Sequence, residues 1–279
     1  MRFGRSLSVV AVAGLASALA PQVRAAAPPL VCTEKAEGGS LVAYGLTADQ
    51  RLICFKLNRP SVNRTIMAPL SLAAPDTALV GIDVRPAGGA VYGLGNGGGI
   101  YLLDPAATKP ELKSRLSVAL EGSSFGVDFN PTVDRLRIIS DSGQNLRVNV
   151  DTGAATVDGF LKNGAVRATG VGSAAYTNVD NDASTATTLY DINGPADLLV
   201  TQAPPNDGTL VTVGKMGFQG SAIGSFDIWS EIKDGKAVSN RGFATLDGGD
   251  VLFEIDLQNG ATTFVGIISA RLIGMAFPV

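Results

Sequence analysis

Apolar and polar residues alternate in short runs along the chain, and turns rich in Gly, Pro, Asn and Asp separate the runs. A period of two is typical of β-strands with one buried face. The densest example is residues 124–156, where Asn130-Pro131 and Asp141-Ser142-Gly143 provide the turns. This segment predicts three consecutive strands, at Phe125–Phe129, Leu136–Ile139 and Leu146–Asn149.

Five similar motifs recur along the chain at intervals of 45 to 51 residues. They are GIDVRP from Gly81, GVDFNP from Gly126, AAYTN from Ala174, SFDIW from Ser225 and IGMAF from Ile273. The first four are each followed by two further alternating runs. A fourth strand is expected at Leu116–Leu120, Ala155–Val157, Leu210–Val213 and Thr263–Ile268. Four short strands in such a repeat are typical of a β-propeller blade.

The two ends of the repeat region complement each other. LVAYGL from Leu41 matches the second strand of the next repeat, AVYGLG, but no first strand precedes it. The last motif is a first strand with nothing after it. We therefore expect an all-β protein, a β-propeller of five four-stranded blades closed by the C-terminal strand, over residues 41–279. The irregular segment Thr185–Asn206 leaves a sixth blade open, and a β-sandwich or an open solenoid is the alternative architecture.

The N-terminal segment has the three parts of a signal peptide. Arg2 and Arg5 precede the apolar run Leu7–Ala20, and Val23-Arg24-Ala25 is a small-x-small cleavage site. We expect a signal peptide at residues 1–25, an extension at 26–40, and a periplasmic or secreted protein. The run is short for a membrane span and no later run is longer, so we expect no membrane insertion.

Charge and cysteine content refine this picture. Cleavage would leave 19 basic and 25 acidic residues, a net charge of −6, which argues against nucleic acid as a partner. Cys32 and Cys54 would then lie in an oxidising compartment, where an even number of cysteines favours pairing. We predict a Cys32–Cys54 disulfide; two independent thiols are the alternative.

Several long motifs resemble one bacterial family of domains of unknown function, DUF4394. They include FGVDFNPTVDRLRIISDSGQNLRVNVDTG, TTLYDI and LVTQAPPNDGTLVTVG, and the resemblance extends from Leu41 to Gly274. The resemblance implies no particular activity. Some members carry labels such as superoxide dismutase, but this chain has no histidine, so a copper–zinc site of that type cannot form.

The absence of histidine also limits the chemistry of an enzyme. It excludes Ser-His-Asp catalysis and histidine-ligated zinc. A catalytic site would have to use carboxylates, Lys, Tyr or a bound cation.

The first strands carry polar residues in a shared register. Their third residues are Asp83, Asp128, Tyr176, Asp227 and Ala276, and two residues later come Arg85, Asn130, Asn178, Trp229 and Pro278. Residues i and i+2 share one face of a strand, and first strands line a propeller's channel, so these side chains could ring its mouth. The three aspartates form a candidate calcium site, with Asn130 and Asn178 as further oxygen ligands. Alternatively, the aspartates cap backbone amides and hold the blades together.

Arginines form a second candidate site. Arg137 and Arg147, with Asp134 and Arg135, could form a buried ion network between blades. Equally, Arg137 and Arg147 could present their guanidinium groups to a carboxylate or phosphate.

These observations favour a binding or scaffold module over an enzyme. Its partner would be a small polar ligand or an extracellular protein or glycan. The alternative is a histidine-free hydrolase or lyase that acts on carbohydrates or lactones through axial carboxylates, with or without calcium.

Overall fold

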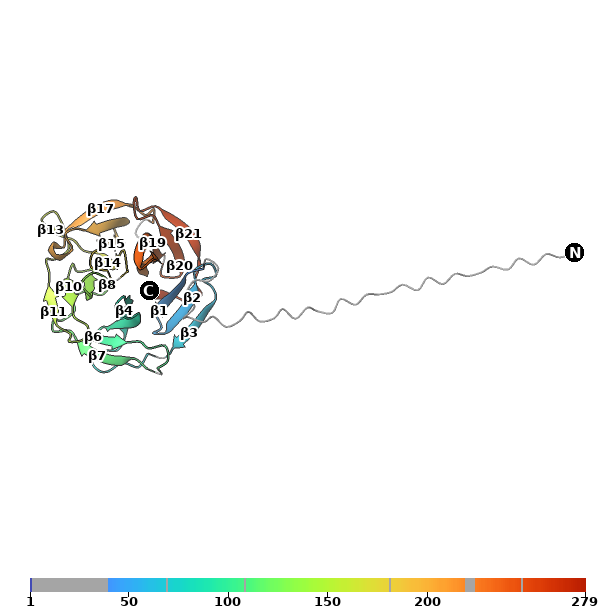
Figure 1. The fold of residues 1–279 in the computed structure, drawn as a ribbon, viewed down its shortest axis with the longest axis horizontal. Helices are drawn as coiled ribbons and strands as arrows, with labels where there is room; N and C mark the ends of the chain where they lie inside the picture. The colour runs from blue at the N-terminus through green and yellow to red at the C-terminus, as the bar shows by residue number, and fades with distance from the viewer. Residues whose placement is uncertain (2–39, 69, 108, 181, 219–223, 247) are drawn as a thin grey trace.

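The computed structural model describes Met1 and residues 40–279, except 69, 108, 181, 219–223 and 247. Within these residues the chain forms five four-stranded antiparallel sheets arranged around a central axis (Figure 1). The fold is therefore the predicted five-bladed β-propeller. Residues 2–39 lie outside the described residues. They include the predicted signal peptide except Met1, and Cys32. The predicted disulfide therefore stays a prediction, with Cys54 buried in β2.

The strands follow the repeat read from the sequence. Blade 1 consists of β22 (Leu272–Ala276), β1 (Val42–Thr47), β2 (Leu52–Lys56) and β3 (Asn63–Met67). Blade 2 consists of β4 (Leu79–Arg85), β5 (Ala90–Gly95), β6 (Gly99–Leu102) and β7 (Glu111–Arg115). Blade 3 consists of β8 (Phe125–Asn130), β9 (Arg135–Ser140), β10 (Asn145–Val148) and β11 (Ala155–Val157).

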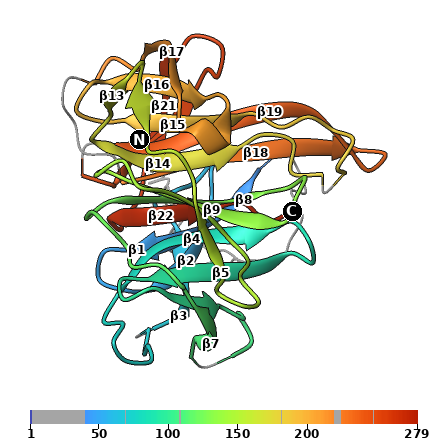
Figure 2. The ribbon, with the colours of Figure 1, turned by 90° about the vertical axis from the view of Figure 1, so that its left-hand side faces the viewer.

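The remaining two blades differ more in strand length. Blade 4 consists of β14 (Val171–Tyr176), β15 (Leu189–Asn193), β16 (Leu198–Gln202) and β17 (Leu210–Lys215). Blade 5 consists of β18 (Ser225–Lys233), β19 (Lys236–Leu246), β20 (Val251–Ile255) and β21 (Thr262–Ile267). The β18–β19 hairpin extends beyond the other blades (Figure 2). A small hairpin, β12 (Lys162–Asn163) with β13 (Val166–Arg167), and the 3₁₀ turn η2 (Pro205–Asp207) complete the described elements.

The C-terminal strand closes the ring as predicted. β22 pairs antiparallel with β1, so that Tyr44 lies opposite Ala276. The irregular segment contributes β15 and β16 to blade 4, and the described residues form no sixth blade. The expected fourth strand at Leu116–Leu120 is wrong: β7 ends at Arg115, and leucines of that segment instead pack against the core between blades 2 and 3.

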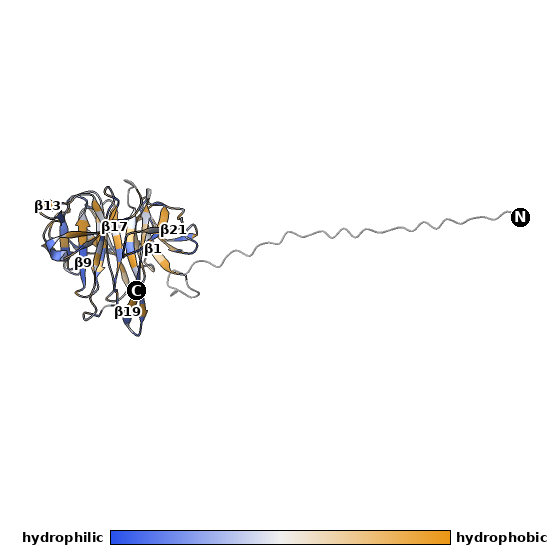
Figure 3. Cartoon of the chain, turned by 90° about the horizontal axis from the view of Figure 1, so that it is seen from above, coloured by the Kyte–Doolittle hydropathy of each residue, from blue (hydrophilic) through white to orange (hydrophobic). Residues whose placement is uncertain are grey.

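Apolar side chains pack mainly between neighbouring blades. Alternate residues of each strand face the blades on either side, so hydrophobic and hydrophilic segments share the same blades in Figure 3. One such cluster joins Tyr92 of blade 2 to Phe129 of blade 3, and another joins Ile139 of blade 3 to Tyr176 of blade 4. Within the described residues, no helix is long and apolar enough to cross a membrane.

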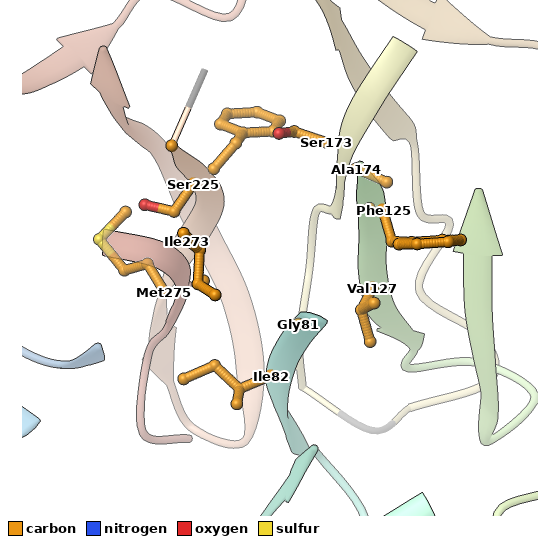
Figure 4. Close-up of a pocket in the computed structure, with 13 residues that line it drawn as sticks. Gly81, Ile82, Phe125, Val127, Ser173, Ala174, Ser225, Ile273 and Met275 are labelled. Carbon is orange, nitrogen blue, oxygen red and sulfur yellow. The ribbon is translucent and has the colours of Figure 1, made fainter. Parts of the chain in front are cut away.

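Small residues bring the first strands close together at the axis. A Cβ atom at Gly81 would lie 2.5 Å from Val127 Cγ2, and one at Gly126 would lie 2.5 Å from the backbone nitrogen of Ala174. Between these strands remains a cavity of about 20 Å³, which Figure 4 shows lined by Gly81, Ser173 and Ser225 among others. A volume of this size holds about one water molecule. The axis at this level is therefore nearly filled rather than an open channel.

Candidate functional site

Three aspartates converge on the axis from three different blades. They are Asp83 of β4, Asp128 of β8 and Asp227 of β18, and one oxygen of each lies within 4.8 Å of the other two. Their exposed fractions are only 4–6%. We call these residues the axial triad. They lie in the closed interior and not at a solvent-filled channel mouth.

The carboxylates of the axial triad accept hydrogen bonds from one backbone N–H at the inner strand of every blade. Each first strand forms the inner edge of its sheet, so this N–H has no partner strand. The five bonds are Val84 N to Asp83 (2.7 Å), Phe129 N to Asp83 (2.6 Å), Tyr176 N to Asp128 (2.9 Å), Ile228 N to Asp227 (2.6 Å) and Phe277 N to Asp227 (2.8 Å).

Three of these bonds cross from one blade to the next. Asp83 reaches Phe129 of blade 3, Asp128 reaches Tyr176 of blade 4, and Asp227 reaches Phe277 beside the closing strand of blade 1. Together the triad supplies acceptors to all five inner edges. This is the arrangement expected of a structural staple between blades.

The bonds also correct the sequence register in blade 4. In blades 3 and 1, the residue whose N–H donates to the triad, Phe129 or Phe277, comes directly after the third residue of the first-strand motif. In blade 4 the N–H donor is Tyr176, which the sequence had assigned as the third residue itself. Ala175 therefore occupies the axial position that the sequence assigned to Tyr176. The Tyr176 side chain instead faces blade 3, where its Oη accepts a hydrogen bond from Arg137 Nε at 3.2 Å. The motif AAYTN has no aspartate to fix the register, which explains the error of one residue.

Burial and mutual repulsion raise the pKa values of the axial triad. Burial raises the pKa of Asp227 to about 7. Burial, and then the charge of Asp227, raises the pKa of Asp83 well above its ordinary value. For Asp128 the causes are burial and the charges of both neighbours. A hydrogen bond between the side chains of Asp128 and Asp227 raises the pKa of Asp128 and lowers that of Asp227. These directions are expected if the protonated carboxyl of Asp128 is the donor and Asp227 the acceptor.

The triad meets the distance requirement for a cation but offers few ligands. Calcium takes six to eight oxygens. The predicted further ligands lie elsewhere: Asn130 Oδ1 accepts hydrogen bonds from the N–H and hydroxyl of Thr132, and Asn178 Oδ1 accepts one from Asn240. Among the described residues, the donor set is therefore three carboxylates whose oxygens mostly already accept an N–H. This set fits calcium poorly.

Two other predicted site residues join neighbouring blades. Arg85 of blade 2 donates to both oxygens of Asp134, at 2.8 and 2.6 Å, and to both oxygens of Asp151, at 3.1 and 3.0 Å. Asn178 of blade 4 is bonded to Asn240 of blade 5. These contacts use up their polar groups, so neither residue lies free at a channel mouth.

A much larger cavity, of about 730 Å³, lies between blades 3 and 4. Its walls are the turn from β8 to β9, the arginines of β9 and β10, residues 183–187 before β15, and the loop containing Pro205 and Asn206. We call it the arginine cavity, because Arg135, Arg137 and Arg147 all line it. Of the predicted site residues, it brings together Asn130, Arg137 and Arg147.

Arg137 is fixed in the wall of this cavity. Its exposed fraction is 1%. Besides Tyr176, it donates to Asn145 Oδ1 at 2.8 Å, Asp158 Oδ2 at 2.7 Å and Asn206 Oδ1 at 2.9 Å. Arg147 donates to the same Asp158 through Nε at 2.6 Å and Nη2 at 2.9 Å. Arg137 and Arg147 thus share Asp158 in an ion network within blade 3, which Arg137 links to blade 4 through Tyr176 and Asn206 and which forms one wall of the cavity. The other two members of the predicted network do not join it, because Asp134 pairs with Arg85 of blade 2 and Arg135 forms no ion pair among the described residues.

Sequence reasoning missed three polar residues near this wall. Asp158 follows the outer strand β11, and Asn206 belongs to a loop of another blade, so no spacing in the sequence connects them to Arg137. Asp191 of β15 is fully buried, and neither of its oxygens has a hydrogen-bond partner among the described residues. Burial raises its pKa well above the ordinary value despite the opposing charge of Arg137.

Comparison with known proteins identifies a family and a fold. The sequence profile of the family described as Domain of unknown function (DUF4394) matches residues 51–276. No curated protein matches the sequence significantly. A chain in the crystal structure of a nidogen/laminin complex is 11% identical, with a TM-score of 0.50, and the alignment covers 86% of this chain and 99% of that one.

Two further solved structures are less similar. An auxiliary nutrient binding protein from Bacteroides thetaiotaomicron is 11% identical with a TM-score of 0.46, covering 85% of this chain and 64% of that one. A glutaminyl cyclase from Myxococcus xanthus is 13% identical with a TM-score of 0.41, covering 72% and 70%. At 11% identity and a TM-score of 0.50, the similarity to the chain of the nidogen/laminin complex shows the fold alone.

Proposed function

For a chain that belongs to the DUF4394 family of domains of unknown function, we propose a role as a binding module whose ligand occupies the arginine cavity. The observation that carries the proposal is a rigid polar wall beside open volume. Ligand sites commonly measure about 300 to 1,000 Å³ and have a few fixed polar groups. The cavity, at about 730 Å³, lies within that range.

The arginine side chains in the wall of the cavity are held in place by other protein groups without a ligand. Arg137 is held by four neighbours from blades 3 and 4, and Asp158 fixes the guanidinium of Arg147 through two bonds. Because these side chains project from strands or are tied to them, binding would cost little conformational entropy. Preorganisation of this kind supports recognition of a small polar ligand.

The lining supports binding rather than hydrolysis or elimination. Among the described residues that line the cavity, the polar ones are Arg, Asn, Ser and Thr, with no carboxylate, Lys or Tyr. General acid–base catalysis needs a group that can exchange a proton near the working pH. The carboxylates that could do so in the axial triad are sealed from solvent. A hydrolase or lyase acting through them would need access that the fold does not provide.

Filling the cavity tests the proposal. Ala186 is exposed and lines the cavity, so Ala186→Trp should occupy the ligand's space without disturbing the core. Thermal-shift screening of charged and neutral small molecules should find compounds that stabilise the wild type and not this variant. The matched control is Ala107→Trp, at an exposed turn of blade 2. Compounds that stabilise Ala186→Trp as well as the wild type would place binding elsewhere.

A cation at the axial triad is the second candidate function. Three carboxylate oxygens that all lie within 4.8 Å of one another favour it. The hydrogen bonds from five backbone N–H groups count against it, as does the small number of ligands. A calcium titration described in the Discussion separates the two.

We also propose that the mature protein is exported, with a disulfide between Cys32 and Cys54. Arg2, Arg5 and the apolar run support export. Intact-mass measurement of protein from its host should show a chain that begins near Ala26, and non-reducing peptide mapping should recover the linked cysteines. Retention of residues 1–25, or free thiols, would contradict these proposals.

A further inference from the structure

We infer that the ligand of the arginine cavity is an anion carrying a carboxylate or phosphate group, and that Arg135 and Arg147 recognise it. This inference rests on the proposed binding function. It begins with the placement of three like charges on one face of a sheet.

Arg135, Arg137 and Arg147 face the same side of blade 3. Arg137 lies directly opposite Arg147 in the pairing of β9 with β10, and Arg135 is two residues before Arg137. Residues in these positions share a face of the sheet. Like charges placed so closely repel unless an opposite charge compensates them.

One carboxylate serves two of the three arginines. Asp158 bonds to Arg137 and Arg147, and its side chain is only 5% exposed. Arg135 donates only to the carbonyl oxygens of Val133 and Asp134, at 3.4 and 2.8 Å. Among the described ion pairs, two guanidinium groups therefore share one carboxylate, and Arg135 takes part in none, so positive charge is in excess.

Two other carboxylates near the cavity are already committed. The side chain of Asp134 accepts hydrogen bonds from Arg85 Nε and Nη2. Asp182, next to the wall segment 183–187, accepts the N–H and hydroxyl of Ser184 and lies 3.9 Å from Lys236 Nζ. Asp191 is fully buried, and its carboxyl oxygens have no hydrogen-bond partner among the described residues. None of them forms an ion pair with Arg135 among the described residues; the pKa of Asp134 is lowered most by its hydrogen bonds from Arg85 and least by the charge of Arg135.

Several N–H groups of the cavity arginines remain available. The Nη1 group of Arg147 and the Nε and Nη2 groups of Arg135 donate to no acceptor among the described residues. The exposed Arg241 differs from Arg135, because its Nε and Nη2 groups both donate to a carboxylate, that of Glu254, at 2.6 and 2.7 Å. A planar guanidinium with free donors fits a carboxylate or phosphate better than a hydroxyl.

The charge of the whole protein makes this cavity distinctive. The chain has 25 acidic and 22 basic residues. A positively charged hollow in an acidic protein concentrates anions locally. Excess positive charge, unused guanidinium donors and open volume thus coincide at one place, and an anion would satisfy all three.

Calorimetric titration at low salt tests the inference with defined probes: inorganic phosphate, citrate and the uncharged trisaccharide maltotriose. The proteins are wild type, Arg135→Gln, Arg147→Gln and the control Arg59→Gln, which removes the same charge at an exposed turn of blade 1. Arg135→Gln removes only contacts to carbonyl oxygens and should fold normally. We expect phosphate or citrate to bind the wild type and Arg59→Gln equally, and Arg135→Gln at least about tenfold more weakly. The two anions distinguish a phosphate from a carboxylate ligand.

Three outcomes would overturn the inference. One is that neither anion binds, and another is that both bind Arg135→Gln as tightly as wild type. The third is that maltotriose binds and the anions do not. In that third case, loss of maltotriose binding in Ala186→Trp would leave the proposed function standing while the anion inference fails. If no compound stabilises the wild type more than Ala186→Trp, the proposed function itself is wrong.

Discussion

The axial triad and the arginine cavity are both dense groups of charged residues, yet they differ in what surrounds the charges. At the triad, three buried acids accept hydrogen bonds from five backbone N–H groups, and the cavity between the same first strands measures only about 20 Å³. At the cavity, arginines outnumber their carboxylate partners beside about 730 Å³. The first group is satisfied within the protein, whereas the second has donors left over and room for a ligand. Polar density alone therefore does not mark a binding site.

The largest effect should follow removal of an acid from the triad. Asp83→Ala leaves the N–H groups of Val84 and Phe129 without their acceptor. Each unsatisfied buried group costs about 1–3 kcal/mol, so we expect the free energy of unfolding to fall by about 2 kcal/mol or more. Urea unfolding measures it.

Two matched variants make this comparison sharp. Asp104→Ala, at an exposed turn, and Arg135→Gln, in the cavity, should each change the free energy of unfolding by about 0.5 kcal/mol or less. A loss below about 1 kcal/mol in Asp83→Ala would mean that the triad does not hold the blades together.

A smaller, pH-dependent effect should follow Asp128→Asn. An amide oxygen can still accept the Tyr176 N–H, and the amide N–H₂ can donate toward Asp227. The folded protein holds protons on the triad that the unfolded chain releases above its ordinary pKa of 3.8. This stabilisation is complete below pH 3.8 and is lost as the pH rises through the folded pKa, which for Asp227 is about 7. One such proton changes the free energy of unfolding by about 1.4 kcal/mol per pH unit.

Chemical unfolding of both proteins between pH 5 and pH 9 checks this sign. Asp128→Asn should lose less stability than wild type as the pH rises, because it has no proton to give up at that position. An equal or steeper loss in Asp128→Asn would show that the triad is ionised in the folded protein, as a bound cation would require.

The smallest expected effect concerns calcium. A ligand that binds only the folded state at 100 times its dissociation constant adds about 2.7 kcal/mol. The carboxylate oxygens of the triad already accept N–H groups. For each of wild type, Asp128→Asn and Asp227→Asn, we therefore expect the thermal midpoint in calcium to equal the midpoint of the same protein in chelator. A calcium-dependent rise in the wild type that both substitutions abolish would establish the triad as a metal site and remove the contrast drawn above.

The sequence predicted the ring and the meeting of the aspartates, because both follow from repeat spacing. Asp83, Asp128 and Asp227 occupy one position in equivalent strands, and a ring brings such positions to its axis. The closed axis was missed, although Gly81 and Gly126 were signals of close approach between first strands. The assignment of Tyr176 failed because its motif contains no aspartate.

The arginine cavity could be predicted only in part. Arg137 and Arg147 stood out because charges on alternating strand positions need partners. Asp158 and Asn206 come from an outer segment and from a loop of the next blade, and only the packing of two blades brings them to Arg137. Arg135 matters because the two neighbouring arginines pair with a carboxylate and Arg135 does not. No sequence pattern records this difference.

The most direct test of the contrast is one titration on three proteins: inorganic phosphate and citrate into wild type, Arg135→Gln and Asp128→Asn, followed by calorimetry. If the cavity is the binding site and the triad is structural, Asp128→Asn should bind at least one anion with the wild-type dissociation constant, and Arg135→Gln should bind it at least about tenfold more weakly. The reverse pattern, with binding lost in Asp128→Asn and kept in Arg135→Gln, would contradict the account.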